Sequence, residues 1–100
     1  MSQYDTYSLY DFLFHTPESG LRKMLVDRNR MTDVHANMLF KIVKGTDPDQ
    51  FAEHFDEKSF PKVRFSAAED KLKEKFWDDI TAVLLERGIL QPALPQKAAA

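Results

Sequence analysis

The feature of this sequence that most constrains its fold is the recurrence of helix-start signals along its 100 residues. Such a signal is a Ser, Thr or Asp whose side chain binds the free backbone N–H groups of a first helical turn, often with Pro or Glu soon after it. The sequence carries these signals at Ser8, Thr16, Thr32, Asp47 and Ser66. Apolar residues follow them at intervals of three and four, so the sequence predicts helices rather than strands.

The stop signals define where these helices end. We expect the first helix to end near His15 and the third to end at Gly45 in a left-handed conformation. The longest helix is predicted from about residue 66 to 87, with a glycine just beyond its end. Residues 59–65 include a proline and are expected to form a short extended connector, and residues 91–100 are expected to form a disordered tail.

These boundaries predict an all-α fold, a compact single domain of four to five helices spanning residues 1–90. The composition fits a packed domain, because 43% of the residues are hydrophobic and 30% are charged. The chain has no cysteine, which excludes disulfides, thiolate metal sites and a cysteine nucleophile. No signal peptide and no membrane-spanning run are apparent, so we expect a cytoplasmic protein without a membrane partner.

Catalytic and metal-binding patterns find no support in the sequence. His15, His35 and His54 belong to different predicted elements, and no two of them have the spacing of a metal-binding pair on a helix. The segment from Asp47 resembles a calcium loop only at its start, since its twelfth position is Lys58 where a bidentate Glu is required. We therefore expect no enzyme activity, no metal and no cofactor.

The first predicted helix, within YSLYDFLF, is apolar on nearly all sides. Tyr7, Tyr10 and Phe14 share one face of it, so they are either core residues or a surface for a partner. Trp77 raises the same question, because it lies about 100° around the last helix from the apolar Phe76. Tyr and Trp are common in protein-binding hot spots, so Tyr7, Tyr10, Phe14 and Trp77 are candidate binding residues.

Charge is unevenly distributed along the chain. Residues 45–60 carry five acids against one base, and residues 22–44 carry six bases against two acids. The candidate acidic binding residues are Asp47, Asp49, Glu53, Asp56 and Glu57. The candidate nucleic-acid-binding residues are Arg22, Lys23, Arg28, Arg30, Lys41 and Lys44. The two charged segments can steer partners, or they can be solvated faces of the fold.

The leading hypothesis is a small non-catalytic interaction protein that acts as a regulator, an inhibitor or an accessory subunit. It would bind a larger protein or complex, including a nucleic-acid-binding one, or a second copy of itself in a homodimer. The alternative is an accessory protein that binds nucleic acid directly, through a helix-turn-helix-like junction in residues 22–44. A net charge of −2 makes direct nucleic-acid binding the weaker hypothesis. A third hypothesis is a small enzyme subunit that supplies a histidine.

Overall fold

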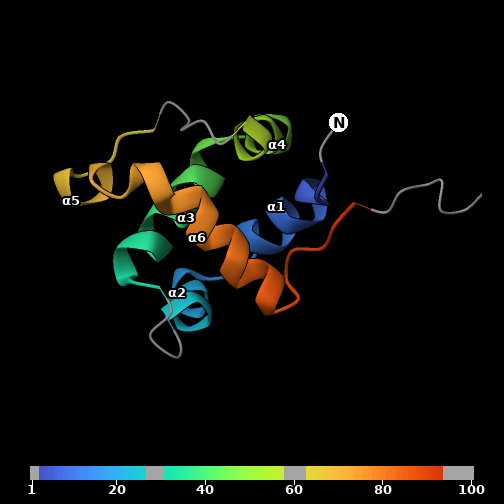
Figure 1. Cartoon of the computed structure of the whole chain (residues 1–100), viewed down its shortest axis with the longest axis horizontal. Coiled ribbons are helices and arrows are strands. Elements are labelled where there is room, and N and C mark those ends of the chain that lie inside the picture. The colour runs from blue at the N-terminus through green and yellow to red at the C-terminus, as the bar shows by residue number, and fades with distance from the viewer. Residues whose placement is uncertain (1–2, 27–30, 58–62, 94–100) are drawn as a thin grey trace, which may run out of the picture.

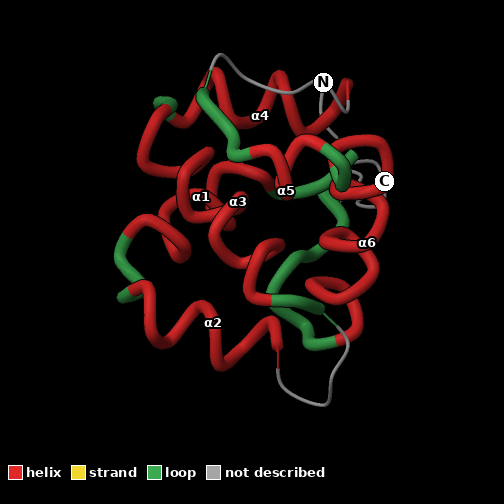
Figure 2. Tube along the Cα trace, turned by 90° about the vertical axis from the view of Figure 1, so that its left-hand side faces the viewer, coloured by secondary structure: helices red, strands yellow, loops and turns green. Residues whose placement is uncertain are grey.

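The computed structural model describes residues 3–26, 31–57 and 63–93. The helices are α1 (Thr6–Phe14), α2 (Glu18–Val26), α3 (Asp33–Gly45), α4 (Pro48–Glu57), α5 (Ala67–Asp70) and α6 (Lys73–Glu86). The described part of the chain contains no strand, only an isolated antiparallel bridge between Tyr4 and Pro92 (Figure 2). The predicted all-α single domain is therefore confirmed.

Helix α3 lies at the centre of the fold, with α1, α2 and α6 around it (Figure 1). Its buried residues are His35, Ala36, Met38, Leu39, Ile42 and Val43. All of these except His35 join one hydrophobic core with apolar residues from α1, α2, α4 and α6. Burying a large apolar side chain contributes about 1.5–3 kcal/mol, so this shared core is the main source of stability. None of the described helices is both long and apolar enough to cross a bilayer.

Local hydrogen bonds confirm three of the predicted helix starts. The Thr32 hydroxyl accepts the N–H of His35 at 3.3 Å, and the Asp47 carboxylate accepts the N–H of Gln50 at 2.8 Å. At the start of α5, the Ser66 hydroxyl accepts a bond of 3.2 Å from the backbone N–H three residues later. Each bond supplies a partner for an N–H that the helix itself cannot satisfy.

The first helix begins earlier than the sequence predicted. Asp5, not Ser8, is its cap, and the Asp5 carboxylate accepts the backbone N–H of Ser8 at 3.1 Å. The helix therefore begins at Thr6, and its last residue is Phe14, one before the predicted end. Both Asp and Ser are good caps, so the sequence alone did not separate the two starts.

Two glycines end helices in different ways. Gly88, the glycine expected just beyond the last helix, has a φ of 74°, which is a left-handed conformation. Gly45 was expected to adopt the same conformation, but it is instead the last helical residue of α3, and Thr46 after it is extended. A Cβ atom on Gly45 would lie 3.4 Å from the nearer methyl group of Val63, so this end of α3 packs against the segment that contains Val63.

The long helix expected over residues 66–87 is divided into α5 and α6. Lys71 and Leu72 separate them, where the N–H of Leu72 binds the carbonyl oxygen of Glu69 at 2.9 Å in a tight turn. The buried Glu69 carboxylate accepts a 2.8 Å bond from Lys41 on α3. This contact holds α5 against α3, and Figure 1 shows α5 turned away from the line of α6.

The connector and the tail are described only in part. Val63, Arg64 and Phe65 have no regular secondary structure, and residues 59–62 of the predicted connector lie outside the described residues. At the C-terminal end, the backbone carbonyl oxygen of Gln91 accepts a hydrogen bond from the N–H of Asp5. The N–H of Ala93 donates to the backbone carbonyl oxygen of Gln3, and each bond is 2.9 Å long. Residues 94–100 of the predicted tail lie outside the described residues.

Candidate protein-binding surface

Tyr10 belongs to the core rather than to an exposed aromatic surface. Its exposed fraction is 8%, and its hydroxyl donates a 2.6 Å hydrogen bond to the carbonyl oxygen of Thr46. Its ring lies 5.6 Å from the rings of both Phe14 and Phe51. Burial raises the pKa of Tyr10, with a further contribution from Asp47. The assignment of Tyr10 as a contact residue does not fit this burial.

Trp77 is also a core residue. Only 2% of it is exposed, and its ring lies 5.0 Å from the rings of Phe55 and Phe76 in edge-to-face geometry. A partner cannot reach this indole while the fold is intact. The assignment of Trp77 as a contact residue is therefore corrected, because the core widens at α4 to include it.

Tyr7 remains at the surface, and it joins two predicted binding elements. It is 55% exposed, and its hydroxyl donates a 2.7 Å hydrogen bond to the Asp49 carboxylate on α4. This hydrogen bond is the main cause of a raised pKa for Tyr7, since the phenolate would face the carboxylate's charge. Tyr7 therefore places the exposed side of α1 directly beside the acidic side of α4.

Phe12 and Phe14 extend the exposed part of α1. Their exposed fractions are 46% and 39%. The ammonium of Lys44 lies 4.0 Å from the centre of the Phe14 ring and donates a 3.0 Å bond to the Phe14 carbonyl oxygen. Phe14 thus combines a cation–π contact inside the fold with a surface accessible to a partner.

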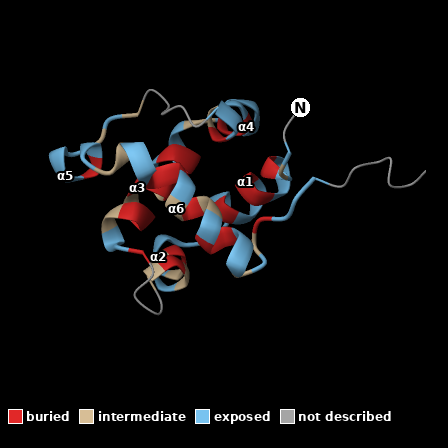
Figure 3. Cartoon of the chain, in the orientation of Figure 1, coloured by how far each residue is buried: buried red, intermediate tan, exposed pale blue. Residues whose placement is uncertain are grey.

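The five acidic candidates are all exposed, and four of them lie on α4. Asp49, Glu53 and Asp56 follow one another at helical spacing on the outer side of α4, with Glu57 beside them, and we call these four residues the acidic stripe. All four are exposed, and Figure 3 shows the outer side of α4 exposed and its inner side buried. Asp47 is also exposed and caps α4.

Several of the basic candidates are engaged within the fold. Arg22 donates a 2.7 Å bond to Glu18 and another to the Asn37 side chain, and it lies 3.8 Å from Asp33, so it ties α2 to α3. Lys41 is bound to the buried Glu69.

Lys44, as described above, is bound to Phe14. Of the remaining basic candidates, Lys23 is exposed on α2. Arg28 and Arg30 lie outside the described residues. Within the described part of the chain, Arg22, Lys41 and Lys44 thus each make a contact inside the fold.

The three histidines are dispersed. His15 is exposed after α1, His54 is half-buried on α4, and His35 is buried in the first turn of α3. Among the residues that the structure describes, no group of three or more His, Cys, Asp or Glu side chains is arranged to hold a metal ion.

His35 has a structural role that the sequence did not indicate. Its Nδ1 lies 2.9 Å from the Thr32 hydroxyl and 3.4 Å from the Thr32 N–H, so it accepts where Glu or Gln usually does in a capping box. Its ring is stacked on Phe76, and its Nε2 lies 3.7 Å from the Asp79 carboxylate. Burial lowers the pKa of His35, outweighing the opposing effect of Asp79, and Lys75 lowers it further.

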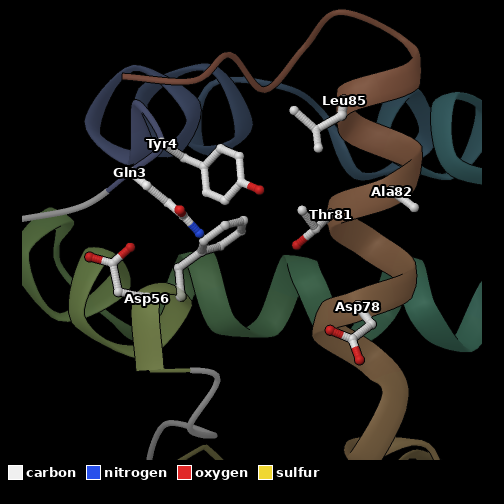
Figure 4. A pocket seen from close by; sticks show the side chains of 8 residues that line it. Gln3, Tyr4, Asp56, Asp78, Thr81, Ala82 and Leu85 are labelled. Carbon is white, nitrogen blue, oxygen red and sulfur yellow. The ribbon is translucent and has the colours of Figure 1, made fainter. Parts of the chain in front are cut away.

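One surface feature was missed by the sequence predictions. A groove of about 280 Å³ lies between the N-terminal segment, the end of α4 and the side of α6 (Figure 4). Its lining residues are Gln3, Tyr4, Phe55, Asp56, Asp78, Thr81, Ala82 and Leu85. The available signal was the position of Leu85, which lies about 140° around α6 from the buried Ile80; Leu84 is buried, whereas Leu85 is 37% exposed.

Tyr7 and Phe14 lie seven residues apart on one face of α1, and Tyr7 is hydrogen-bonded to Asp49 of the acidic stripe, so these side chains share one surface. We call this the aromatic–acidic surface: Tyr7 and Phe14 together with the acidic stripe. Aromatic rings supply contact area, and carboxylates attract positive charge. No protein-family model, curated protein or solved structure matches this chain.

Proposed function

We propose that this protein is a small non-catalytic interaction protein that binds a larger, positively charged protein through the aromatic–acidic surface. The observation that carries the proposal is the 2.7 Å hydrogen bond between Tyr7 and Asp49. Through it, two features that lie 42 residues apart in the chain become neighbours on one surface. A regulator, an inhibitor or an accessory subunit acts by this kind of contact.

Charge supports a basic partner. Helix α4 contains no Lys or Arg, and its four exposed carboxylates face outward. Complementary charge accelerates encounter and disfavours partners of like charge. A basic groove that normally binds nucleic acid is one surface of this kind, and its occupation would make the protein an inhibitor. A cytoplasmic location is part of the proposal, and the absence of cysteine agrees with it.

The test is a comparison of proteins retained by the immobilised chain and by two charge variants. The first carries Asp49→Asn, Glu53→Gln and Glu57→Gln in the acidic stripe. The matched control carries Asp70→Asn, Glu74→Gln and Glu86→Gln, which remove the same charge from α5 and α6. The retained proteins are identified and purified. Their affinities for the wild type and for both variants are then measured by titration at low and high salt.

We expect a basic protein that binds the wild type and the control but loses at least tenfold in affinity for the stripe variant. Its affinity should also fall as salt rises, since the attraction is between exposed charges. Equal affinity for the stripe variant and the wild type, or binding that salt does not change, would contradict the proposal.

A further inference from the structure

The groove between α4 and α6 has walls of different chemistry. The Tyr4 and Phe55 rings meet edge to face at 6.0 Å on one side. Figure 4 shows Tyr4 and the side chains of Thr81 and Leu85 projecting from opposite walls toward the space between them. One wall of the groove is therefore aromatic, and the other carries both polar and apolar side chains.

Among the described residues, the charged side chains that line the groove are both acidic. They are Asp56 on α4 and Asp78 on α6, which stand on different walls. Asp56 is also a member of the acidic stripe, so the groove continues the aromatic–acidic surface without a break. A ligand that approaches the stripe from the side of Tyr7 meets the groove at the stripe's other end.

The size of the groove restricts its occupant. Its volume of about 280 Å³ lies just below the range of about 300–1,000 Å³ that is typical of small-molecule and cofactor pockets. A single long side chain is a better match than a cofactor. Two carboxylates among its lining residues favour a positively charged side chain.

Arginine fits these walls better than lysine does. Its guanidinium is planar, it stacks on aromatic rings, and it is more weakly hydrated than an ammonium group. It also forms paired hydrogen bonds with carboxylates, and its three methylene groups can pack along an apolar residue such as Leu85. The residues that line the groove include an aromatic, a carboxylate and an apolar partner for each of these contacts.

We infer that this groove, lined by Tyr4, Phe55, Asp56, Asp78 and Leu85, is a binding site for an arginine side chain of the basic partner protein. The inference rests on the proposed function and extends it, because it names the residue type that anchors the partner. The stripe attracts the partner, and the groove fixes its position.

The test uses a small probe and the full-length chain, so that no partner need be known. The ¹⁵N-labelled protein is titrated with N-acetyl-arginine methylamide, and amide shifts are followed by NMR. N-acetyl-norleucine methylamide, which lacks the charge, is titrated in parallel. The variant is Asp78→Asn, and the matched control is Asp70→Asn, which removes the same charge from the exposed surface of α5.

We expect the arginine probe to shift the amides of Asp56, Thr81 and Ala82 in a saturable way. Its dissociation constant should rise at least threefold in Asp78→Asn and remain unchanged in Asp70→Asn. The norleucine probe should produce shifts that are several times smaller. Equal shifts from both probes, shifts elsewhere on the chain, or equal affinity in Asp78→Asn would overturn the inference.

Two further outcomes separate this inference from its alternatives. If the arginine probe binds only after Lys97→Gln, the chain's own C-terminal lysine competes for the groove, and the assignment to a partner is overturned. If the probe binds as expected but stripe substitutions leave partner binding unchanged, the proposed function fails while the arginine site stands. If the probe fails to bind as expected but the stripe substitutions weaken partner binding, the arginine site is overturned and the proposed function stands.

Discussion

The Nζ atom of Lys41 lies 2.8 Å from Oε1 of Glu69, whose side chain is only 4% exposed. The same oxygen accepts a 2.7 Å bond from the backbone N–H of Ser66. Burial alone would raise the pKa of Glu69, but the bonds from Lys41 and Ser66 outweigh it and hold the pKa below its usual value. The pair therefore keeps a charged carboxylate inside the fold and anchors α5 on α3.

Replacement of Lys41 should destabilise the protein. Lys41→Met leaves the buried Glu69 carboxylate without its charged partner, and we expect a loss of about 1–3 kcal/mol in the free energy of unfolding. Urea denaturation followed by circular dichroism measures it. The control Lys23→Met alters an exposed residue of α2 and should change the value by less than about 0.5 kcal/mol. Equal effects of the two substitutions would argue against the anchoring role.

His35 should make stability depend on pH. Its pKa is lower in the folded protein than the usual 6.5, so the unfolded chain binds this proton more readily. The resulting stabilisation is complete above the unfolded pKa and is lost as pH falls through the folded pKa. We expect the free energy of unfolding to decrease as pH is lowered from about 7.5 to about 5.

His35→Gln removes this titration and keeps an acceptor for the Thr32 N–H, because Gln at this position completes a capping box. Urea denaturation across the pH range should therefore give a smaller slope for His35→Gln than for the wild type. His15→Gln, at an exposed position, is the control. An unchanged slope in His35→Gln would assign the pH dependence to other groups.

Tyr10 should show the energetics of a core residue. Tyr10→Asp places a charge in the core, and we expect a loss of about 3 kcal/mol or more with extensive unfolding. Tyr10→Phe removes only the bond to Thr46 and should cost about 1 kcal/mol. Tyr7→Phe removes an exposed bond and should cost less than Tyr10→Phe. A fully folded, equally stable Tyr10→Asp variant would show that this residue is exposed after all.

The glycines should respond to alanine with opposite signs. Gly88→Ala forces a side chain into a φ of 74° and should lower the free energy of unfolding by about 1 kcal/mol. Gly20→Ala adds a Cβ within α2 at an ordinary 3.5 Å from Thr16, and we expect a gain of about 0.5–1 kcal/mol. Thermal unfolding shows whether each variant gains or loses stability. A gain in stability for Gly88→Ala would be inconsistent with the left-handed conformation.

In isolation the protein should be a monomer of 11.6 kDa. A second copy would bring one acidic stripe against another unless the surfaces were offset, and like charges oppose such contacts. Light scattering behind size exclusion, over a range of concentrations, measures the mass. A dimer that Tyr7→Asp converts to a folded monomer would instead make the aromatic–acidic surface a self-association interface.

Local signals explain which parts of the fold were predictable. The caps at Thr32, Asp47 and Ser66 involve residues three positions apart, so the sequence contains the whole interaction. The contact that holds α5 on α3 joins Glu69 to Lys41, 28 residues earlier, and no short pattern reveals that contact.

In the candidate surface, too, local features could be predicted and contacts between distant residues could not. The acidic stripe could be predicted because its members lie on one helix at helical spacing. The burial of Trp77 depends on Phe55, 22 positions earlier, and the groove requires Tyr4, Phe55 and Leu85 from three separate segments. Only the folded chain shows which aromatic side chains are left at the surface.

The hydrogen bonds that join Asp5 to Gln91 and Ala93 to Gln3 connect the two ends of the described chain. A force that pulls these ends apart loads the two hydrogen bonds one after the other, starting with the bond between Ala93 and Gln3. These two bonds should therefore break before the helical core unfolds. Because Gln3 and Tyr4 line the groove, such tension would dismantle the groove while most of the molecule stayed folded.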